Sequence, residues 1–199
     1  MTQHAYTVVA PLRRATLLCA LIGVAAAASA CSDPYAMKAQ YTNATQIFVV
    51  HALSGSALNF SSALSLPAKA TTKVDGSFSF DVAFDLNAKG DVVFLPPHTV
   101  GENPLGNRQV GIQKATTTYD LVTLAPTAGY TYDSVTVAKR GETVIVQAPS
   151  TTCSLYALPY LYAKVVVDSI DPTTRTLYGR TMINSNCTFR SLEAGLPTK

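Results

Sequence analysis

Ser77-Phe78-Ser79-Phe80-Asp81-Val82-Ala83-Phe84-Asp85-Leu86 is the stretch that decides the fold class. Apolar and aromatic residues occupy every second position, and small or polar residues lie between them. This period of two is typical of a β-strand with one face on a core and the other toward solvent. The stretch predicts a strand whose core-facing side chains are Phe78, Phe80, Val82, Phe84 and Leu86.

Two tight turns join predicted strands into hairpins. Asn87-Ala88-Lys89-Gly90 separates the 77–86 strand from a second apolar run at 91–95. Asp171-Pro172-Thr173-Thr174 separates the strands predicted at 160–170 and 175–183. Asp at the first position and Pro at the second favour a type I turn. The second turn therefore gives the clearest hairpin of the chain.

The rest of the chain after residue 44 also consists of short strand patterns between turn residues. No amphipathic helix of ten or more residues is apparent after Cys31, although residues 153–158 are ambiguous and could hold a helical turn. This organisation predicts an all-β domain, an antiparallel β-sandwich of the immunoglobulin-like or a related kind, with a β-barrel as the alternative. The further strands are predicted at 45–53, 57–66, 108–113, 119–125, 132–138 and 143–147.

The N-terminal region has the features of an export signal. Arg13 and Arg14 precede an uncharged run from Ala15 to Ala30, which ends in small residues before Cys31. The run is too short for a comfortable membrane span of roughly 20 residues. It predicts a signal peptide helix at residues 1–30.

Ala28-Ser29-Ala30-Cys31 resembles the lipobox of bacterial lipoproteins. The resemblance implies cleavage between Ala30 and Cys31 and attachment of lipid to the Cys31 thiol. Ala28 departs from the family pattern, in which Leu is commonest at that position. The alternative is an ordinary cleavable signal, with Ala28-Ser29-Ala30 as its cleavage site and Cys31 as an incidental thiol.

The lipoprotein resemblance also implies a domain organisation and a location. Residues 31–44 become a lipidated tether, and residues 45–199 become a single β-sandwich domain. Ser32, instead of Asp, after the lipidated cysteine is associated in this family with transfer to the outer membrane. The expected location is the cell envelope, with the membrane itself as one partner through the lipid on Cys31.

Charge and cysteine positions limit the remaining possibilities. Arg13 and Arg14 are the only charged side chains before Cys31, so the rest of the chain carries 13 basic and 12 acidic side chains. This balance argues against a nucleic-acid partner. Cys153 and Cys187 are expected to form a disulfide in an oxidising compartment, with two buried free thiols as the alternative. No histidine follows either cysteine at ligand spacing, so no metal site is predicted.

The long loop at residues 96–107 is the candidate ligand site. It contains three prolines and two glycines, and long loops in compact domains are often functional. His98, Glu102 and the following Arg108 are its candidate binding residues. His51, inside an apolar strand, is expected to be structural. Tyrosines near the 160–183 hairpin, expected mainly to fill the sheet face, also suit a partner or a glycan: Tyr156, Tyr160, Tyr162 and Tyr178.

The sequence contains no catalytic signature. It has no Gly-x-Ser-x-Gly nucleophile elbow and no glycine-rich phosphate-binding motif, and no cofactor is predicted. The leading expectation is a lipid-anchored envelope protein that acts as a non-enzymatic interaction or structural module, with an envelope protein or a glycan as partner. The first alternative is a lipoprotein that binds a ligand or glycan through the 96–108 loop, and the second is an envelope hydrolase.

The lipid anchor predicts a specific processing defect. Cys31→Ala, or inhibition of lipoprotein signal peptidase by globomycin, should leave uncleaved precursor or release the protein from membranes. The measurement is immunoblotting of membrane and soluble fractions for precursor and mature bands. Unchanged processing and unchanged membrane attachment in both experiments would rule out lipidation at Cys31.

Overall fold

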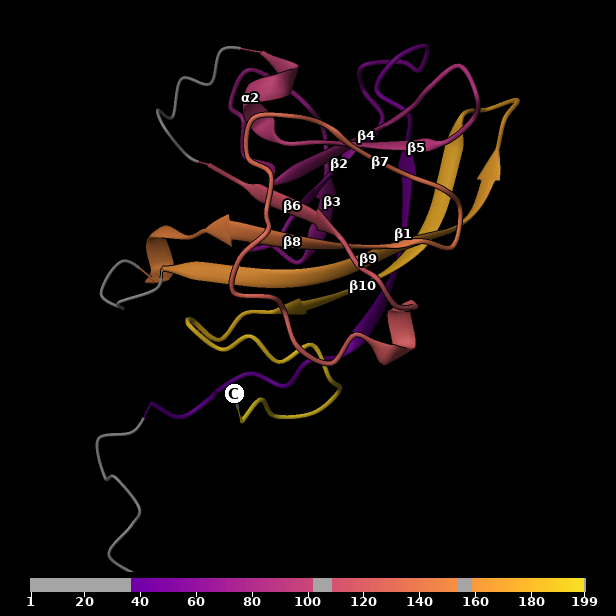
Figure 1. The fold of residues 1–199 in the computed structure, drawn as a ribbon. Helices are drawn as coiled ribbons and strands as arrows, with labels where there is room; N and C mark the ends of the chain where they lie inside the picture. Colours follow the sequence, from indigo (N-terminus) through magenta and orange to yellow (C-terminus); the bar gives the residue numbers. More distant parts are fainter. Residues whose placement is uncertain (1–36, 102–108, 154–158, 199) are drawn as a thin grey trace, which may run out of the picture. The chain divides into compact units, whose positions relative to one another are not determined.

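A computed structural model describes residues 37–101, 109–153 and 159–198 of the chain. From Ala39 onward the chain forms one compact unit. The described strands form two antiparallel sheets of five strands each, and these strands close no barrel (Figure 1). The predicted β-sandwich is therefore confirmed, and the barrel alternative is not observed.

Sheet 1 has the strand order β1-β10-β9-β8-β6, and sheet 2 has the order β3-β2-β4-β5-β7. The strands of sheet 1 are β1 (Thr45–His51), β10 (Thr176–Asn184), β9 (Tyr160–Asp171), β8 (Thr143–Pro149) and β6 (Gly111–Lys114). Those of sheet 2 are β3 (Ala70–Thr72), β2 (Ala63–Ser65), β4 (Val82–Leu86), β5 (Val92–Leu95) and β7 (Thr136–Ala138). Three single-turn helices also occur among the described residues: α2 (Pro97–Val100), η1 (Tyr119–Leu121) and η2 (Thr151–Cys153).

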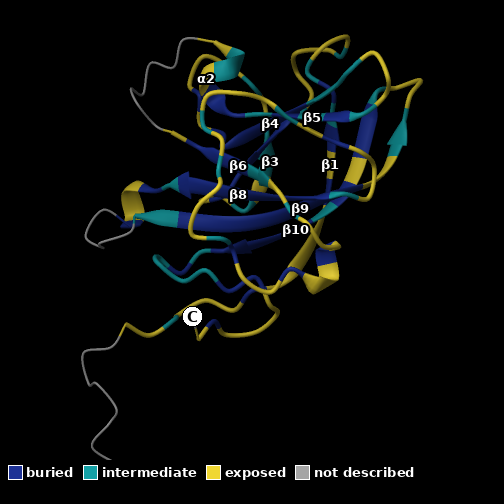
Figure 2. Cartoon of the chain, in the orientation of Figure 1, coloured by how far each residue is buried: buried dark blue, intermediate teal, exposed yellow. Residues whose placement is uncertain are grey.

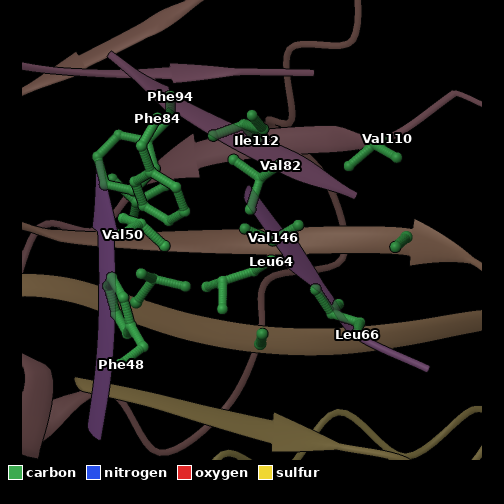
Figure 3. Packing of buried hydrophobic residues seen from close by; sticks show 14 of the residues in the cluster. Phe48, Val50, Leu64, Leu66, Val82, Phe84, Phe94, Val110, Ile112 and Val146 are labelled. Carbon is green, nitrogen blue, oxygen red and sulfur yellow. The ribbon is translucent and has the colours of Figure 1, made fainter. Parts of the chain in front are cut away.

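The main core lies between the two sheets and takes alternate side chains from each of them. Phe84 of β4 is central, because its ring centroid lies 5.4 Å from that of Phe48 in β1 and 5.2 Å from that of Phe94 in β5. Figure 3 shows these three rings together, with Val50 beside them. Aromatic contacts at this spacing add to the burial of apolar area. They join an edge strand of sheet 1 to the middle of sheet 2.

The strand predicted at 77–86 begins only at Val82. Val82 and Phe84 face the main core, with Leu86 packed against it, as predicted. The prediction for Phe78 and Phe80 is wrong, because these rings form a separate cluster with Ala63 and Ala83.

A turn before β4 breaks the period of two. The Phe78 N–H donates to the Asp75 carbonyl at 3.1 Å, and Phe78 has a φ of 48°. The buried Asp81 carboxylate then accepts the Leu66 N–H at 2.6 Å. These contacts bend the chain, so the two phenylalanines reach the opposite face of sheet 2 from Val82.

Both predicted hairpins are confirmed, as the antiparallel pairs β4–β5 and β9–β10. The strand predicted at 119–125 is wrong, because this segment forms η1 and an irregular continuation. Lys164 explains the difference: its Nζ donates to the carbonyls of Tyr119 and Val122, each at 2.9 Å. These carbonyls therefore point toward a lysine and not into a strand ladder.

Cys153 and Cys187 form the predicted disulfide, with their Cα atoms 5.4 Å apart. Cys153 ends η2 just before β9, and Cys187 follows β10, so the disulfide joins the open end of this hairpin. With a sequence separation of 34 between the two positions, loop closure of this kind is worth about 3–4 kcal/mol in the chain-entropy model.

Residues 40–43, which the sequence assigns to the tether, are held against the domain. The Asn186 amide accepts the Gln40 and Tyr41 N–H groups and donates to the Tyr41 carbonyl. Asn43 exchanges two backbone hydrogen bonds with Gly195. The segment ahead of β1 is thus fixed at the domain surface from Gln40 onward.

Gly179 in β10 lies tightly between its two neighbouring strands of sheet 1, against Val166 of β9 and Phe48 of β1. A Cβ atom there would overlap the Val166 carbonyl and lie 2.5 Å from a ring carbon of Phe48. The pairing of β10 with β9 also shifts register between Tyr178 and Gly179. A side chain at this position would displace backbone or the Phe48 ring.

Gly179→Ala is therefore expected to reduce the free energy of unfolding by about 3 kcal/mol through overpacking. The matched control is Gly76→Ala, where a Cβ would meet no atom within 4 Å; its effect should stay within about 0.5 kcal/mol. Urea denaturation monitored by circular dichroism measures the free energy of unfolding of both variants. Equal stability of the two variants would contradict the packing described for Gly179.

Candidate functional site

The residues that the sequence proposes as a ligand site are only partly described. His98 lies in α2, and its Nε2 is 3.7 Å from Oδ1 of the exposed Asp133. Glu102 and Arg108 lie outside the described residues, so the 96–108 site remains a prediction. Ala30, Cys31 and Tyr156 also lie outside them, and the signal cleavage and lipidation remain predictions as well.

A surface hollow of about 570 Å³ lies at the end of β1 that contains His51. Its walls come from β1, β10, the segment after β1 and the turn between β9 and β10. We call it the aromatic hollow; its lining residues are Val49, His51, Gly55, Ser56, Ala57, Phe60, Asp171, Thr174, Thr176 and Tyr178.

One wall of the aromatic hollow is apolar. His51 and Phe60 stack with ring centroids 4.3 Å apart and planes inclined by 20°. Val49 is paired with Tyr178 across the β1–β10 ladder, so their side chains lie on the same face of sheet 1. Because Phe48 and Val50 point into the core, Val49 and His51 point outward from the sandwich.

The other wall is polar and follows from the β9–β10 turn. The Asp171 carboxylate accepts the Thr174 hydroxyl at 2.8 Å and the Thr173 N–H at 2.9 Å. These hydrogen bonds, that from the Thr174 hydroxyl foremost, lower the pKa of Asp171. The Thr174 and Thr176 hydroxyl oxygens lie 2.7 Å apart. The wall thus presents a carboxylate that is ionised at neutral pH beside two hydroxyls.

Arg175 ties the two walls together. Its Nε donates to the Ser54 carbonyl at 2.7 Å, and its guanidinium pairs with Asp85 of β4 at 3.1 Å. Ser54 in turn hydrogen-bonds to the Asp85 carboxylate through its hydroxyl. Gly55, with a φ of 73°, lets the Arg175 side chain pass close by, since a Cβ there would lie 3.2 Å from Arg175 Cδ. These contacts fix the two walls of the hollow relative to each other.

Two groups in the hollow keep hydrogen-bonding capacity for a ligand. Within the described part of the chain, neither the imidazole nitrogens of His51 nor the Tyr178 hydroxyl makes a hydrogen bond to protein, and the His51 ring is engaged by stacking on Phe60. Tyr178 is exposed and His51 is half-buried. The hollow can therefore offer apolar ring faces together with hydrogen-bonding groups.

The other tyrosines near the hairpin mostly fill the sheet face, as the sequence favours. Tyr162 is buried, and its hydroxyl accepts from the Gln147 amide at 3.2 Å. Tyr132 donates to the same amide at 2.7 Å. Burial raises the pKa of Tyr130, which packs beside Tyr162. These tyrosine side chains stabilise the segment around residues 130–132, which crosses β6, β8 and β9.

Lys164 is a buried cation, and no pattern in the sequence distinguishes it from the other lysines. Besides the carbonyls of Tyr119 and Val122, its Nζ lies 4.6 Å from the centroid of the Tyr119 ring. Burial lowers its pKa, and Arg180 acts in the same direction, whereas Asp120 and Glu193 oppose the shift. Its contacts indicate a structural role, which is to hold η1 on the outer face of sheet 1.

Two further findings concern the described residues alone. Among them there is no group of three or more His, Cys, Asp or Glu side chains that could hold a metal ion. They also include no helix long and apolar enough to cross a membrane. Comparisons with protein-family models, curated proteins and solved structures find no match for this chain.

Lys164→Met should weaken the fold and alter its pH dependence. Loss of the ammonium leaves two buried carbonyls without a donor, at a cost of about 1–3 kcal/mol. Because burial holds the pKa of Lys164 in the folded protein below the ordinary lysine value of 10.5, the unfolded chain binds more protons as the pH approaches 10.5. This group therefore makes the wild-type protein more stable as the pH rises through the folded pKa, and the variant should lose that contribution.

Urea titrations of wild type and variant from about pH 7 to pH 10 measure the two slopes. Lys89→Met, at the exposed β4–β5 turn, is the matched control and should keep the wild-type slope. A Lys164→Met variant with wild-type stability and slope would contradict the buried-cation assignment.

Proposed function

We propose that this chain is a lipid-anchored protein of the bacterial cell envelope that acts as a non-enzymatic interaction module. The observation that carries the binding role is a bare apolar surface on β1, β10 and residues 57–60. Ile47 and Leu58 are each 82% exposed, Val49 and Phe60 are each 44% exposed, and Tyr178 is 42% exposed.

This surface is contiguous, which distinguishes it from single exposed apolar residues. Val49, Phe60 and Tyr178 line the same hollow, and Ile47 follows Val49 on the outer face of β1 at the strand spacing of two. Exposed contiguous apolar surface of this kind commonly marks an interaction site.

The rest of sheet 1 shows how its outer face is otherwise covered. Over β8 and β9, Ile145 and Tyr162 are buried under residues 115–130 and Leu192. Figure 2 shows these two strands buried along most of their length. Over β10, Met182 packs against Tyr119. The described chain thus covers β8, β9 and the Met182 end of β10, and it leaves the outer face bare around Ile47, Val49 and Tyr178.

The chemistry of this bare surface favours a partner without strong charge. Among the described residues, no Lys or Arg side chain lines the aromatic hollow, and Asp171 is the one carboxylate in its lining. This agrees with the near-neutral balance of the chain after Cys31 and disfavours a polyanion. An envelope protein or a glycan remains the proposed partner.

The location rests on the lipobox resemblance at Ala28–Cys31. Lipid on Cys31 would hold the domain at the membrane, and Ser32 supports transfer to the outer membrane. Attachment through more than one acyl chain is stable, because each buried methylene contributes about 0.8 kcal/mol. An anchored protein with a bare apolar surface is suited to holding a partner at that membrane.

The test combines the anchor with the surface. Full-length protein is captured by cross-linking from its own envelope, as wild type, as Ile47→Ser/Val49→Ser and as Leu121→Ser. Leu121 is 69% exposed in η1, away from the aromatic hollow, and serves as the matched control.

The Ile47→Ser/Val49→Ser variant should recover at least tenfold less partner by quantitative mass spectrometry, whereas Leu121→Ser should recover the wild-type amount. Both variants should stay folded, because the replaced side chains are exposed. Equal recovery by all three proteins, or no specific partner for wild type, would contradict the proposed function.

A further inference from the structure

We infer that the aromatic hollow binds a neutral carbohydrate, with one sugar ring against Tyr178 and Phe60. The inference names the ligand class for the proposed binding surface and rests on that proposed function. It places the carbohydrate site in the aromatic hollow instead of the 96–108 loop. The sequence does not predict that the residues of the hollow lie close together.

Sugar rings combine apolar C–H faces with a rim of hydroxyl groups. The hollow combines the matching groups, since Phe60 and Tyr178 present partly exposed ring surface around its apolar wall. Phe60 stacks on His51 at a centroid distance of 4.3 Å, which restricts the movement of both rings. A ring held in this way contributes contact area with little loss of side-chain entropy on binding.

The polar wall supplies partners for sugar hydroxyls. Asp171 is ionised and acts only as an acceptor, so it can take hydroxyl donors beyond those from its own turn. The Tyr178 hydroxyl, which can donate and accept, and the imidazole of His51 make no hydrogen bond elsewhere in the described chain and are left for the ligand. Donors and acceptors thus surround the apolar wall.

Charge selects a neutral sugar over an acidic one. The nearest arginine, Arg175, directs its guanidinium to Ser54, Asp85 and the Leu86 carbonyl. A carboxylate or phosphate on the ligand would therefore meet Asp171 without a compensating Lys or Arg in the hollow. Like charges placed close together disfavour binding.

Size and rigidity fit a short oligosaccharide. The hollow, at about 570 Å³, lies within the range of about 300–1,000 Å³ that is typical of ligand sites. The Arg175–Asp85 ion pair and the bond from Arg175 to Ser54 fix both walls before binding. Preorganisation lowers the ordering cost, which matters for a ligand that gains few strong contacts.

The test uses full-length protein in a detergent without a sugar headgroup. The probes are maltotriose, chitotriose, galactotriose and mannotriose, with trigalacturonate as the acidic counterpart. Saturation-transfer NMR identifies binders, and isothermal titration calorimetry gives the Kd. The variants are Phe60→Ala and Tyr178→Ala, and the matched control is Tyr41→Ala, an exposed tyrosine outside the hollow.

At least one neutral trisaccharide should bind wild type and Tyr41→Ala with equal affinity. Phe60→Ala and Tyr178→Ala should each raise its Kd at least tenfold, and trigalacturonate should bind at least tenfold more weakly than the neutral probe. Circular dichroism confirms that each variant is folded.

The inference would be overturned by no binding of any neutral probe to folded wild type, by binding that survives both aromatic substitutions, or by preference for trigalacturonate.

The two experiments together distinguish the carbohydrate assignment from the proposed function. If the neutral probes fail while Ile47→Ser/Val49→Ser still loses its envelope partner, the carbohydrate assignment is wrong and the interaction module stands. If both experiments fail, both proposals are wrong. A protein partner that needs Tyr178 and is not displaced by any sugar also overturns the carbohydrate assignment.

Discussion

The packing of Phe48, Phe84 and Phe94 between the two sheets is the constraint on which the rest of the structure depends. Burial of these rings fixes which residues of β1 face inward. Since strand side chains alternate, the placement of Phe48 and Val50 in the core forces Ile47, Val49 and His51 to the outside. The bare surface is thus a direct consequence of how the core is filled.

The chain then covers the outer face of sheet 1 unequally. Two carbonyls and an aromatic ring contact the buried ammonium of Lys164. These contacts offset the free energy of removing the charge from water. Lys164 holds η1 over β9, and Arg180 extends this arrangement through its pair with Asp168 at 2.9 Å and its contact with the Tyr119 ring. Beyond Arg180 no segment of the described chain covers the outer face, and the apolar surface begins there with Ile47, its cross-strand neighbour.

The sequence predicts those features that are encoded locally. Alternation from Val82 to Leu86 predicts a strand and its inner face correctly, and the Asp171-Pro172 turn predicts its hairpin. Alternation fails at Phe78 because Asp75 and the buried Asp81 bend the chain through contacts that no period reveals. The pattern at 119–125 fails because its carbonyls bind a lysine more than 40 residues away.

The aromatic hollow could not be predicted from the sequence for the same reason. Tyr178 comes from a segment of the chain far from His51 and Phe60, and Arg175 joins the walls through partners 90 and 121 residues away. The sequence contains one local indication of the hollow, which is the presence of apolar Leu58 and Phe60 in a serine-rich turn. Exposed apolar side chains do not stabilise a loop, so their presence there suggests a binding role. The prediction of a site in the 96–108 loop rests on the composition of that loop, and composition does not show which side chains lie close together in the fold.

The hollow and the bound segment 40–43 lie at opposite ends of β1. Gln40 to Asn43 are hydrogen-bonded to the domain and lead into Thr45 at the start of the strand. The hollow lies at the other end of this strand, beside His51. Six residue steps of about 3.3 Å separate Thr45 from His51, a distance of about 20 Å. β1 therefore separates the bound segment 40–43 from the hollow by most of its length. The hydrogen bonds of Asn186 and Asn43 fix the chain ahead of this strand, so these two buried amides stabilise the end of β1 that lies away from the hollow.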